Sequence, residues 1–227
     1  MVDIEKEIQS KKDPIQAKIL SRFFKTGKGQ YGEGDIFLGV TVPTLRIIVK
    51  KYYKEISLRE VQKLLNSKIH EYRLTALLIL VEKYKEDKEL IYNTYIKNFR
   101  NINNWNLVDL TAPKIMGDFL KDKNRDILYS LATSNNLWEK RISIVATFAF
   151  IKDNDFKDTL KISEILLKDE HDLIHKAVGW MLREVGKRNK DLEKEFLDKY
   201  YRIMPRTMLR YSIEKFDPKE KEFYMKK

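Results

Sequence analysis

Cysteine is absent from this chain of 227 residues, and histidine is rare, with three copies. Without thiols the chain has no disulfides and no thiolate metal sites. Of the three histidines, His171 and His175 lie four residues apart, but no HExxH pattern surrounds them. We therefore expect these two side chains at helix ends or on the surface, and we predict no metal site.

The sequence also lacks a long apolar run. The first residues, MVDIEKEIQSKKDP, carry no apolar core of signal-peptide length, and no uninterrupted apolar stretch could span a bilayer. We expect a soluble, cytoplasmic protein that does not bind membranes. Nothing in the sequence indicates an obligate dimer, so a monomer is expected.

Acidic residues are outnumbered by basic ones. Forty-five Lys and Arg against 34 Asp and Glu leave a net charge of +11 and a pI near 9.5. Such an excess favours nucleic acid or another anionic surface as the partner. Most lysines are nevertheless expected on solvated helix faces.

Helical signals run along nearly the whole chain, and no stretch shows sustained period-two alternation. Pro14 and Pro43 stand at first helical positions after the capping residues Asp13 and Thr41, and Ser57 begins a capping box. The pattern predicts an all-α fold. The expected helices are 15–24, 45–53, 61–65, 72–84, 89–99, 107–120, 125–133, 138–151, 156–167, 173–186, 191–200, 205–216 and 219–225.

Short polar breaks separate these helices into units of about 40 residues, which is typical of HEAT-like repeats. We predict a single domain, residues 1–227, that forms a right-handed helical-repeat solenoid with a basic concave face. Such a face suits a DNA duplex better than a small metabolite. Because identity between the units is weak, periodicity alone leaves an irregular helical bundle open.

Residues 26–42, TGKGQYGEGDIFLGVTV, depart from the helical rhythm and hold five of the eight glycines. A glycine-rich stretch around Lys28 raises the possibility of a phosphate cradle, but the GxxxxGK[ST] order is missing and no strand precedes it. The favoured interpretation is a flexible connection whose FLGV end packs into the next repeat. An intermediate interpretation places the loop and Lys28 near a DNA backbone.

Two tryptophans, one aspartate and two arginines recur at helical spacing in the second half of the chain. Trp105 and Asp109 are four residues apart and Trp180 and Arg183 are three apart, so each pair shares one helix face. Arg141 lies between the pairs, 32 residues after Asp109 and 39 before Trp180. If repeats stack, these side chains can converge on one surface.

Each of these residues also has an ordinary structural interpretation. A tryptophan in a helical repeat usually packs in the core, and Trp138 is assigned to the core for that reason. Asp109 could cap a helix or form a salt bridge. Arg141 lies in an apolar run, where an unpaired guanidinium would be costly, so it is harder to explain as ordinary packing.

Three strings in order carry a family resemblance: WNLVDLTAPKIMGDFL (105–120), LWEKRISIVATFAFIK (137–152) and IHKAVGWMLRE (174–184). Together with FLGVTVP (37–43), they resemble the DNA alkylation repair family of AlkD-type alkylpurine DNA glycosylases. The resemblance implies a HEAT-like solenoid that holds duplex DNA. It also implies excision of cationic N3- and N7-alkylated purines without a metal or cofactor.

The resemblance assigns roles to individual residues. Asp109 resembles the catalytic carboxylate, Trp105 and Trp180 the indoles beside the damaged nucleotide, and Arg141 the arginine next to the carboxylate. Arg183 resembles a contact to the DNA backbone.

Lys176, in the third string, and Lys28 complete the set expected to bind DNA. The chain departs from the best-known members in having Asn104-Trp105 where they have two adjacent tryptophans. Its glycine-rich insertion at 27–34 also looks longer than theirs.

A single carboxylate is sufficient to hydrolyse the glycosidic bond of a cationic purine. Glycosidases that act on ordinary sugars use two carboxyl groups, one of which protonates the leaving group. An alkylated purine is already cationic and needs no acid, so one aspartate suffices to support the oxocarbenium-like state. Two alternatives stay open: a non-catalytic binder of damaged or branched DNA on the same scaffold, and a HEAT-type scaffold for protein partners.

Overall fold

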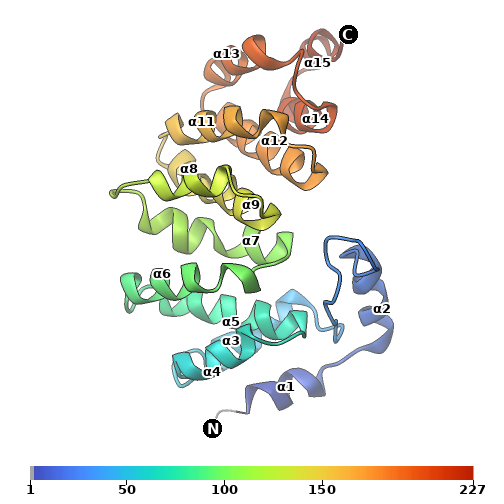
Figure 1. The fold of residues 1–227 in the computed structure, drawn as a ribbon, viewed down its shortest axis with the longest axis vertical. Coiled ribbons are helices and arrows are strands. Elements are labelled where there is room, and N and C mark those ends of the chain that lie inside the picture. Colours follow the sequence, from blue (N-terminus) through green and yellow to red (C-terminus); the bar gives the residue numbers. More distant parts are fainter. Residues whose placement is uncertain (1–2, 227) are drawn as a thin grey trace. The chain divides into compact units, whose positions relative to one another are not determined.

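The computed structural model describes residues 3–226, and most of these residues are helical, with no β-strand among them (Figure 1). The predicted all-α, helical-repeat class is confirmed. Contacts divide the chain into two compact units, residues 1–111 and 112–227. Single-domain organisation, handedness and a basic concave face stay predictions.

The first unit begins with a helix that the sequence patterns did not predict, α1. Its α-helices are α1 (Ile4–Ser10), α2 (Pro14–Phe23), α3 (Val42–Tyr52), α4 (Leu58–Leu65), α5 (His70–Lys83), α6 (Lys88–Lys97) and α7 (Trp105–Thr111). A short 3-10 turn, Phe99–Asn101, precedes α7.

The predicted helix starts of this unit are confirmed by their caps. The Asp13 carboxylate accepts hydrogen bonds from the amides of Ile15 and Gln16 at the start of α2. Thr41 caps α3, and Ser57 forms the full capping box of α4. These local bonds satisfy amides that have no partner inside the helix.

The central helix of the first unit is α5. Its apolar spacing predicts one buried stripe, yet every residue from Tyr72 to Leu80 is buried. The reason is that α3, α4 and α7 all pack against α5 (Figure 1). Polar residues at the start of α5 are buried as well, and they hold the glycine-rich segment.

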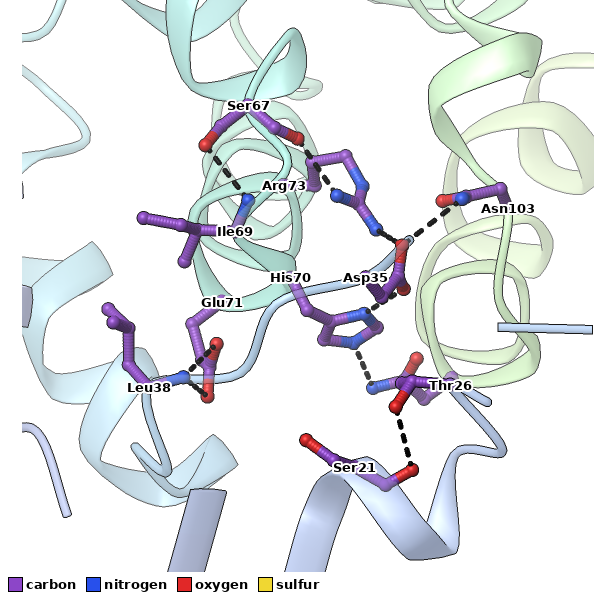
Figure 2. A network of polar contacts seen from close by, with 11 residues as sticks. Ser21, Thr26, Asp35, Leu38, Ser67, Ile69, His70, Glu71, Arg73 and Asn103 are labelled. Atoms are coloured by element: carbon purple, nitrogen blue, oxygen red, sulfur yellow. Dashed lines mark hydrogen bonds and ion pairs between the residues drawn. The ribbon is translucent and has the colours of Figure 1, made fainter. Parts of the chain in front are cut away.

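The glycine-rich segment is fastened to the start of α5. Glu71, 2% exposed, accepts hydrogen bonds from the amides of Leu38, Gly39 and Val40, and the bonds to Leu38 appear in Figure 2. A parallel bridge joins Ile36 to Ile69. The expectation that the FLGV end packs inward is confirmed, because Phe37 and Val40 are buried.

Gly39 is required at the end of this segment. Its φ is +87°, and a Cβ there would overlap the carbonyl oxygen of Asp13. We expect Gly39→Ala to lower the free energy of unfolding by about 2–3 kcal/mol, since left-handed strain and a backbone clash add. Urea denaturation measures the change.

Gly29→Ala is the matched control for this substitution. Gly29 has φ +75°, but nothing lies within 4 Å of its added Cβ. Only the left-handed strain then remains, and the expected loss is about 1 kcal/mol. Equal losses for the two variants would contradict the clash with Asp13.

The second unit contains the helices that carry the other candidate residues. They are α8 (Asp126–Ala132), α9 (Leu137–Ala146), α10 (Phe148–Lys152), α11 (Lys157–Ile165), α12 (Asp172–Gly186), α13 (Lys190–Tyr200), α14 (Arg206–Ser212) and α15 (Pro218–Met225). Helix α12 packs against α9, α13 and α14. At Gly179 the α14 backbone comes so close that a Cβ would overlap the Met208 carbonyl oxygen.

Two long helices of the prediction are interrupted in the structure. Within the expected helix 107–120, α7 ends at Thr111, because Pro113 has no amide to continue the α-helical ladder. A π-helical turn, Pro113–Gly117, follows and leads into two more helical residues. The expected helix 138–151 divides at Thr147 into α9 and α10. Within residues 3–226, no helix is both long and apolar enough to cross a membrane.

Candidate functional site

Helix α7 carries the first predicted pair, Trp105 and Asp109. The helix is only seven residues long, and both side chains lie on one face because they are four residues apart. Both are half-buried, whereas Leu107 and Val108 on the opposite side are fully buried against the core. The indole and the carboxylate are therefore neighbours on the surface of the first unit.

Two phenylalanines at the end of α2 surround the indole of Trp105. The ring of Phe24 stacks on it, with 5.0 Å between centroids and 24° between planes. Phe23 meets the same indole edge-on at 5.8 Å and stays 60% exposed. Sequence reasoning missed both residues, because they lie about eighty positions before Trp105 and match no spacing within α7. An adjacent aromatic pair at a helix end was the available signal.

A fully buried tyrosine lies within electrostatic reach of Asp109. The Tyr95 hydroxyl hydrogen-bonds to Thr111 Oγ1 at 3.0 Å, and Thr111 in turn donates to the Leu107 carbonyl oxygen. Burial raises the pKa of Tyr95, and the charge of Asp109 raises it further. Tyr95 therefore stays a neutral hydroxyl beneath the carboxylate, and it supplies no competing negative charge.

Arg141 lies on α9 in the second unit and is 5% exposed. Its guanidinium donates a hydrogen bond to the Leu173 carbonyl oxygen at the start of α12. An unpaired guanidinium in this apolar run would be costly, and the hydrogen bond to the Leu173 carbonyl oxygen removes part of that cost. Trp138, on the same helix, is 8% exposed, so its assignment to the core is confirmed.

Helix α12 carries the second predicted pair. Trp180 is half-buried and contacts Phe148, with 6.0 Å between ring centroids. Arg183, one turn further, forms an ion pair with Glu214 and lies 3.8 Å from Glu184. The guanidinium of Arg183, which the family resemblance assigns to a DNA phosphate, is therefore already in contact with two carboxylates of the protein.

The two lysines expected to bind DNA differ in their surroundings. Lys176 forms an i,i+4 ion pair with Asp172, with 2.7 Å between charged atoms. Lys28 is exposed in the glycine-rich segment. Both positions allow contact with an anion, since surface ion pairs on helices are weak and exchange readily with solvent.

His171 and His175 lie at the start of α12, in agreement with the expected position at a helix end. His171 caps α12, where its Nδ1 accepts a hydrogen bond from the Leu173 amide, and His175 Nε2 contacts the Asp169 carbonyl oxygen at 2.5 Å. Burial lowers the pKa of His171, which favours the neutral ring that such a cap needs. Across residues 3–226, no three His, Asp or Glu side chains gather to hold a metal ion.

The predicted site residues thus fall in both units. The first unit brings Trp105 and Asp109 together, and the second unit places Arg141, Trp180 and Arg183 on the adjacent helices α9 and α12. Convergence of the two groups on one surface stays a prediction.

Comparison with known proteins gives a family for this chain and a similar solved structure. A family model described as DNA alkylation repair enzyme matches residues 4–216. Among solved structures, a predicted DNA alkylation repair enzyme from Enterococcus faecalis is similar, with a TM-score of 0.75 and 17% sequence identity over 92% of this chain and 98% of that one. At that identity the likeness shows the fold. No curated protein matches the chain.

Proposed function

This chain belongs to the DNA alkylation repair enzyme family, and we propose that it is a DNA glycosylase for cationic N3- and N7-alkylated purines in duplex DNA. The observation that carries the proposal is the pairing of Trp105 with Asp109 on one face of α7, with the indole braced by Phe24. An indole held in place beside a carboxylate suits a reaction in which both the substrate base and the transition state are positively charged.

The reaction requires one carboxylate. As the bond between the sugar C1′ and the purine nitrogen breaks, its electron pair neutralises the cationic base, which leaves without a proton. Positive charge grows on the deoxyribose, and Asp109 stabilises it. A water oxygen then bonds to C1′ and releases its proton to the carboxylate or to solvent.

The indoles favour the same charge distribution. An aromatic face attracts a cation by roughly 0.5–2 kcal/mol, depending on desolvation. Trp105 and Trp180 would therefore discriminate a cationic lesion from a neutral base. Arg141 would keep Asp109 ionised or bind a phosphate, and Arg183, Lys176 and Lys28 would bind the DNA backbone without reading sequence.

The test is release of free base. Purified protein is incubated with duplex DNA that carries N7-methylguanine or N3-methyladenine, and free base is quantified against undamaged DNA. Release from the damaged duplex is the expected result. Tight binding without release would overturn the glycosylase proposal and favour a non-catalytic DNA binder. Absence of both would favour a protein-interaction scaffold, as would weak binding that does not depend on salt concentration.

Arg183 gives a separate prediction about affinity. Because Glu214 holds its guanidinium, a DNA phosphate must displace that carboxylate. We expect Glu214→Gln to strengthen binding to duplex DNA about threefold to tenfold, which corresponds to about 1 kcal/mol. Fluorescence anisotropy at several salt concentrations measures the effect.

Glu222→Gln is the control for Glu214→Gln, because it removes the same formal charge from an exposed carboxylate that pairs with Lys226 instead. Equal strengthening by both variants would mean that net charge, and not release of Arg183, sets the affinity.

A further inference from the structure

Trp105 is bracketed by two asparagines, and both bond to one buried pair. Asn103 Nδ2 donates to Asp35 Oδ1 at 3.3 Å, and Asn106 Nδ2 lies 3.0 Å from His70 Nε2. His70 Nδ1 is in turn 3.0 Å from Asp35 Oδ2, as Figure 2 shows for His70, Asp35 and Asn103. The chain on each side of the indole is therefore tied to the same two side chains.

The Asp35–His70 pair is itself firmly held. Asp35 is 8% exposed and His70 1%. Arg73 donates to Asp35 Oδ1 at 2.6 Å and to the Ser67 carbonyl oxygen at 2.8 Å (Figure 2). Burial would raise the pKa of Asp35, but the hydrogen bond from His70 and the charge of Arg73 hold it below its ordinary value. Asp35, its ion-pair partner Arg73 and His70 thus form a fixed buried anchor.

The hydrogen-bond partners of His70 indicate which of its ring nitrogens donates and which accepts. Asp35 is an ionised acceptor, so His70 Nδ1 carries a proton and donates it. His70 Nε2 is then free to accept the Asn106 amide hydrogen, an assignment made from the hydrogen-bond network. In this arrangement His70 links an acceptor on the glycine-rich segment to a donor on α7.

A second connection runs through the aromatic rings. The imidazole of His70 stacks on Phe37 at 4.5 Å and lies 5.3 Å from Phe24, measured between ring centroids. Phe24 stacks on Phe37 and also on Trp105, each at 5.0 Å. The imidazole that makes both hydrogen bonds is therefore also packed against Phe24, the ring that supports the indole.

The side chain of Asn104, immediately before α7, forms no hydrogen bond that could hold the start of the helix. Asn104 is fully buried, but neither atom of its side-chain amide has a hydrogen-bond partner. Asparagine at this place commonly caps the following helix. Because Asn104 does not, the side-chain hydrogen bonds that fasten the start of α7 to the rest of the unit come from Asn103 and Asn106.

We propose that His70 is a positioning residue, which together with Asp35 sets the Trp105 indole and, through α7, the Asp109 carboxylate. This inference rests on the proposed glycosylase function for its kinetic consequence. It also gives the glycine-rich segment a role: residue 35 of that segment carries the anchor.

Two substitutions of His70 separate its two bonds. His70→Asn keeps a donor near Asp35 but cannot reach Asn106, whereas His70→Gln extends an amide toward Asn106. We expect kcat to fall roughly tenfold or more in His70→Asn, because a catalytic group misplaced by about 1 Å can cost up to a hundredfold. His70→Gln should regain part of that loss. The KM for DNA should stay within about twofold in both variants, since two of the three proposed backbone contacts, Arg183 and Lys176, lie on α12.

Two further variants separate a loss of positioning from a loss of stability. Leu77→Ala, on the same helix and fully buried, should lower the melting temperature without lowering kcat. If His70→Asn does not fold, Asn106→Ala truncates the other side of the same bond and should lower kcat in the same way.

A spectroscopic measurement decides the inference even if the wild type releases no base. With Trp138 and Trp180 replaced by Phe, Trp105 is the single tryptophan, and acrylamide quenching reports its exposure. We expect stronger quenching in His70→Asn than in the parent, with His70→Gln in between. Unchanged quenching in His70→Asn, or unchanged kcat in an active enzyme, would overturn the positioning role. Absence of base release by the wild type would overturn only the proposed function.

Discussion

Replacing Asp109 by asparagine is expected to lower the rate of base release about a hundredfold or more. The amide keeps the size of the side chain but cannot stabilise positive charge on the deoxyribose. Loss of one preorganised electrostatic partner costs roughly 3–4 kcal/mol in comparable sites, which corresponds to at least two orders of magnitude in rate. Single-turnover release of N7-methylguanine measures the effect.

Duplex binding should survive the Asp109→Asn change, because removing a negative charge cannot weaken attraction to phosphates. Asp122→Asn is the matched control, since Asp122 is exposed and loses the same charge. Unaltered release by Asp109→Asn would leave the activity in place and remove this carboxylate from its mechanism.

The second large effect concerns stability and pH. Glu193 lies in the first turn of α13, 2% exposed, beside Gly186 of α12, and its Oε1 has no hydrogen-bond partner. Burial raises the pKa of Glu193 to about 8. The folded protein therefore keeps the proton on Glu193 over a pH range in which the unfolded chain has lost it.

The sign of the pH dependence follows from linkage. The contribution of neutral Glu193 is complete below pH 4.5, its ordinary pKa, and is lost as the pH rises to about 8. Across that range the free energy of unfolding should fall by about 4 kcal/mol, since each pH unit is worth a little over 1 kcal/mol. Glu193→Gln does not titrate, so its stability relative to wild type should increase by that amount between the two pH values.

Urea denaturation at pH 4.5, 6 and 8 measures the difference between Glu193→Gln and wild type. Glu195→Gln, an exposed change on the same helix, should leave the pH dependence of the wild type unchanged. Parallel stability curves for Glu193→Gln and wild type would mean that Glu193 is ionised in the folded protein.

Local chemistry made much of the fold predictable from the sequence. The caps Asp13, Thr41 and Ser57 act within three residues of themselves, and the structure confirms each of them. The break after Thr111 was missed although Pro113 carries its signal, because the apolar spacing continues through 107–120. Burial of α5 on all sides could not be predicted, since its cause is the packing of three other helices.

In the candidate site too, the local features could be predicted from the sequence and the long-range contacts could not. The pairing of Trp105 with Asp109 on one face follows from helical spacing and is present in α7. The Phe24 stack and the Asp35–His70 anchor join residues separated by dozens of positions, so no local pattern indicates them. The ion pair between Arg183 and Glu214 could not be predicted from the sequence either, because Glu214 lies 31 residues further along the chain.

The tip of the glycine-rich segment makes the chain convenient for labelling. Its base is fastened through Glu71 and Asp35, while Gln30 at the tip is exposed. Because the protein has no cysteine, Gln30→Cys would create its sole thiol. A fluorophore attached there would sit on an anchored loop, outside the polar network that holds Trp105, and would test in real time whether a duplex approaches this loop.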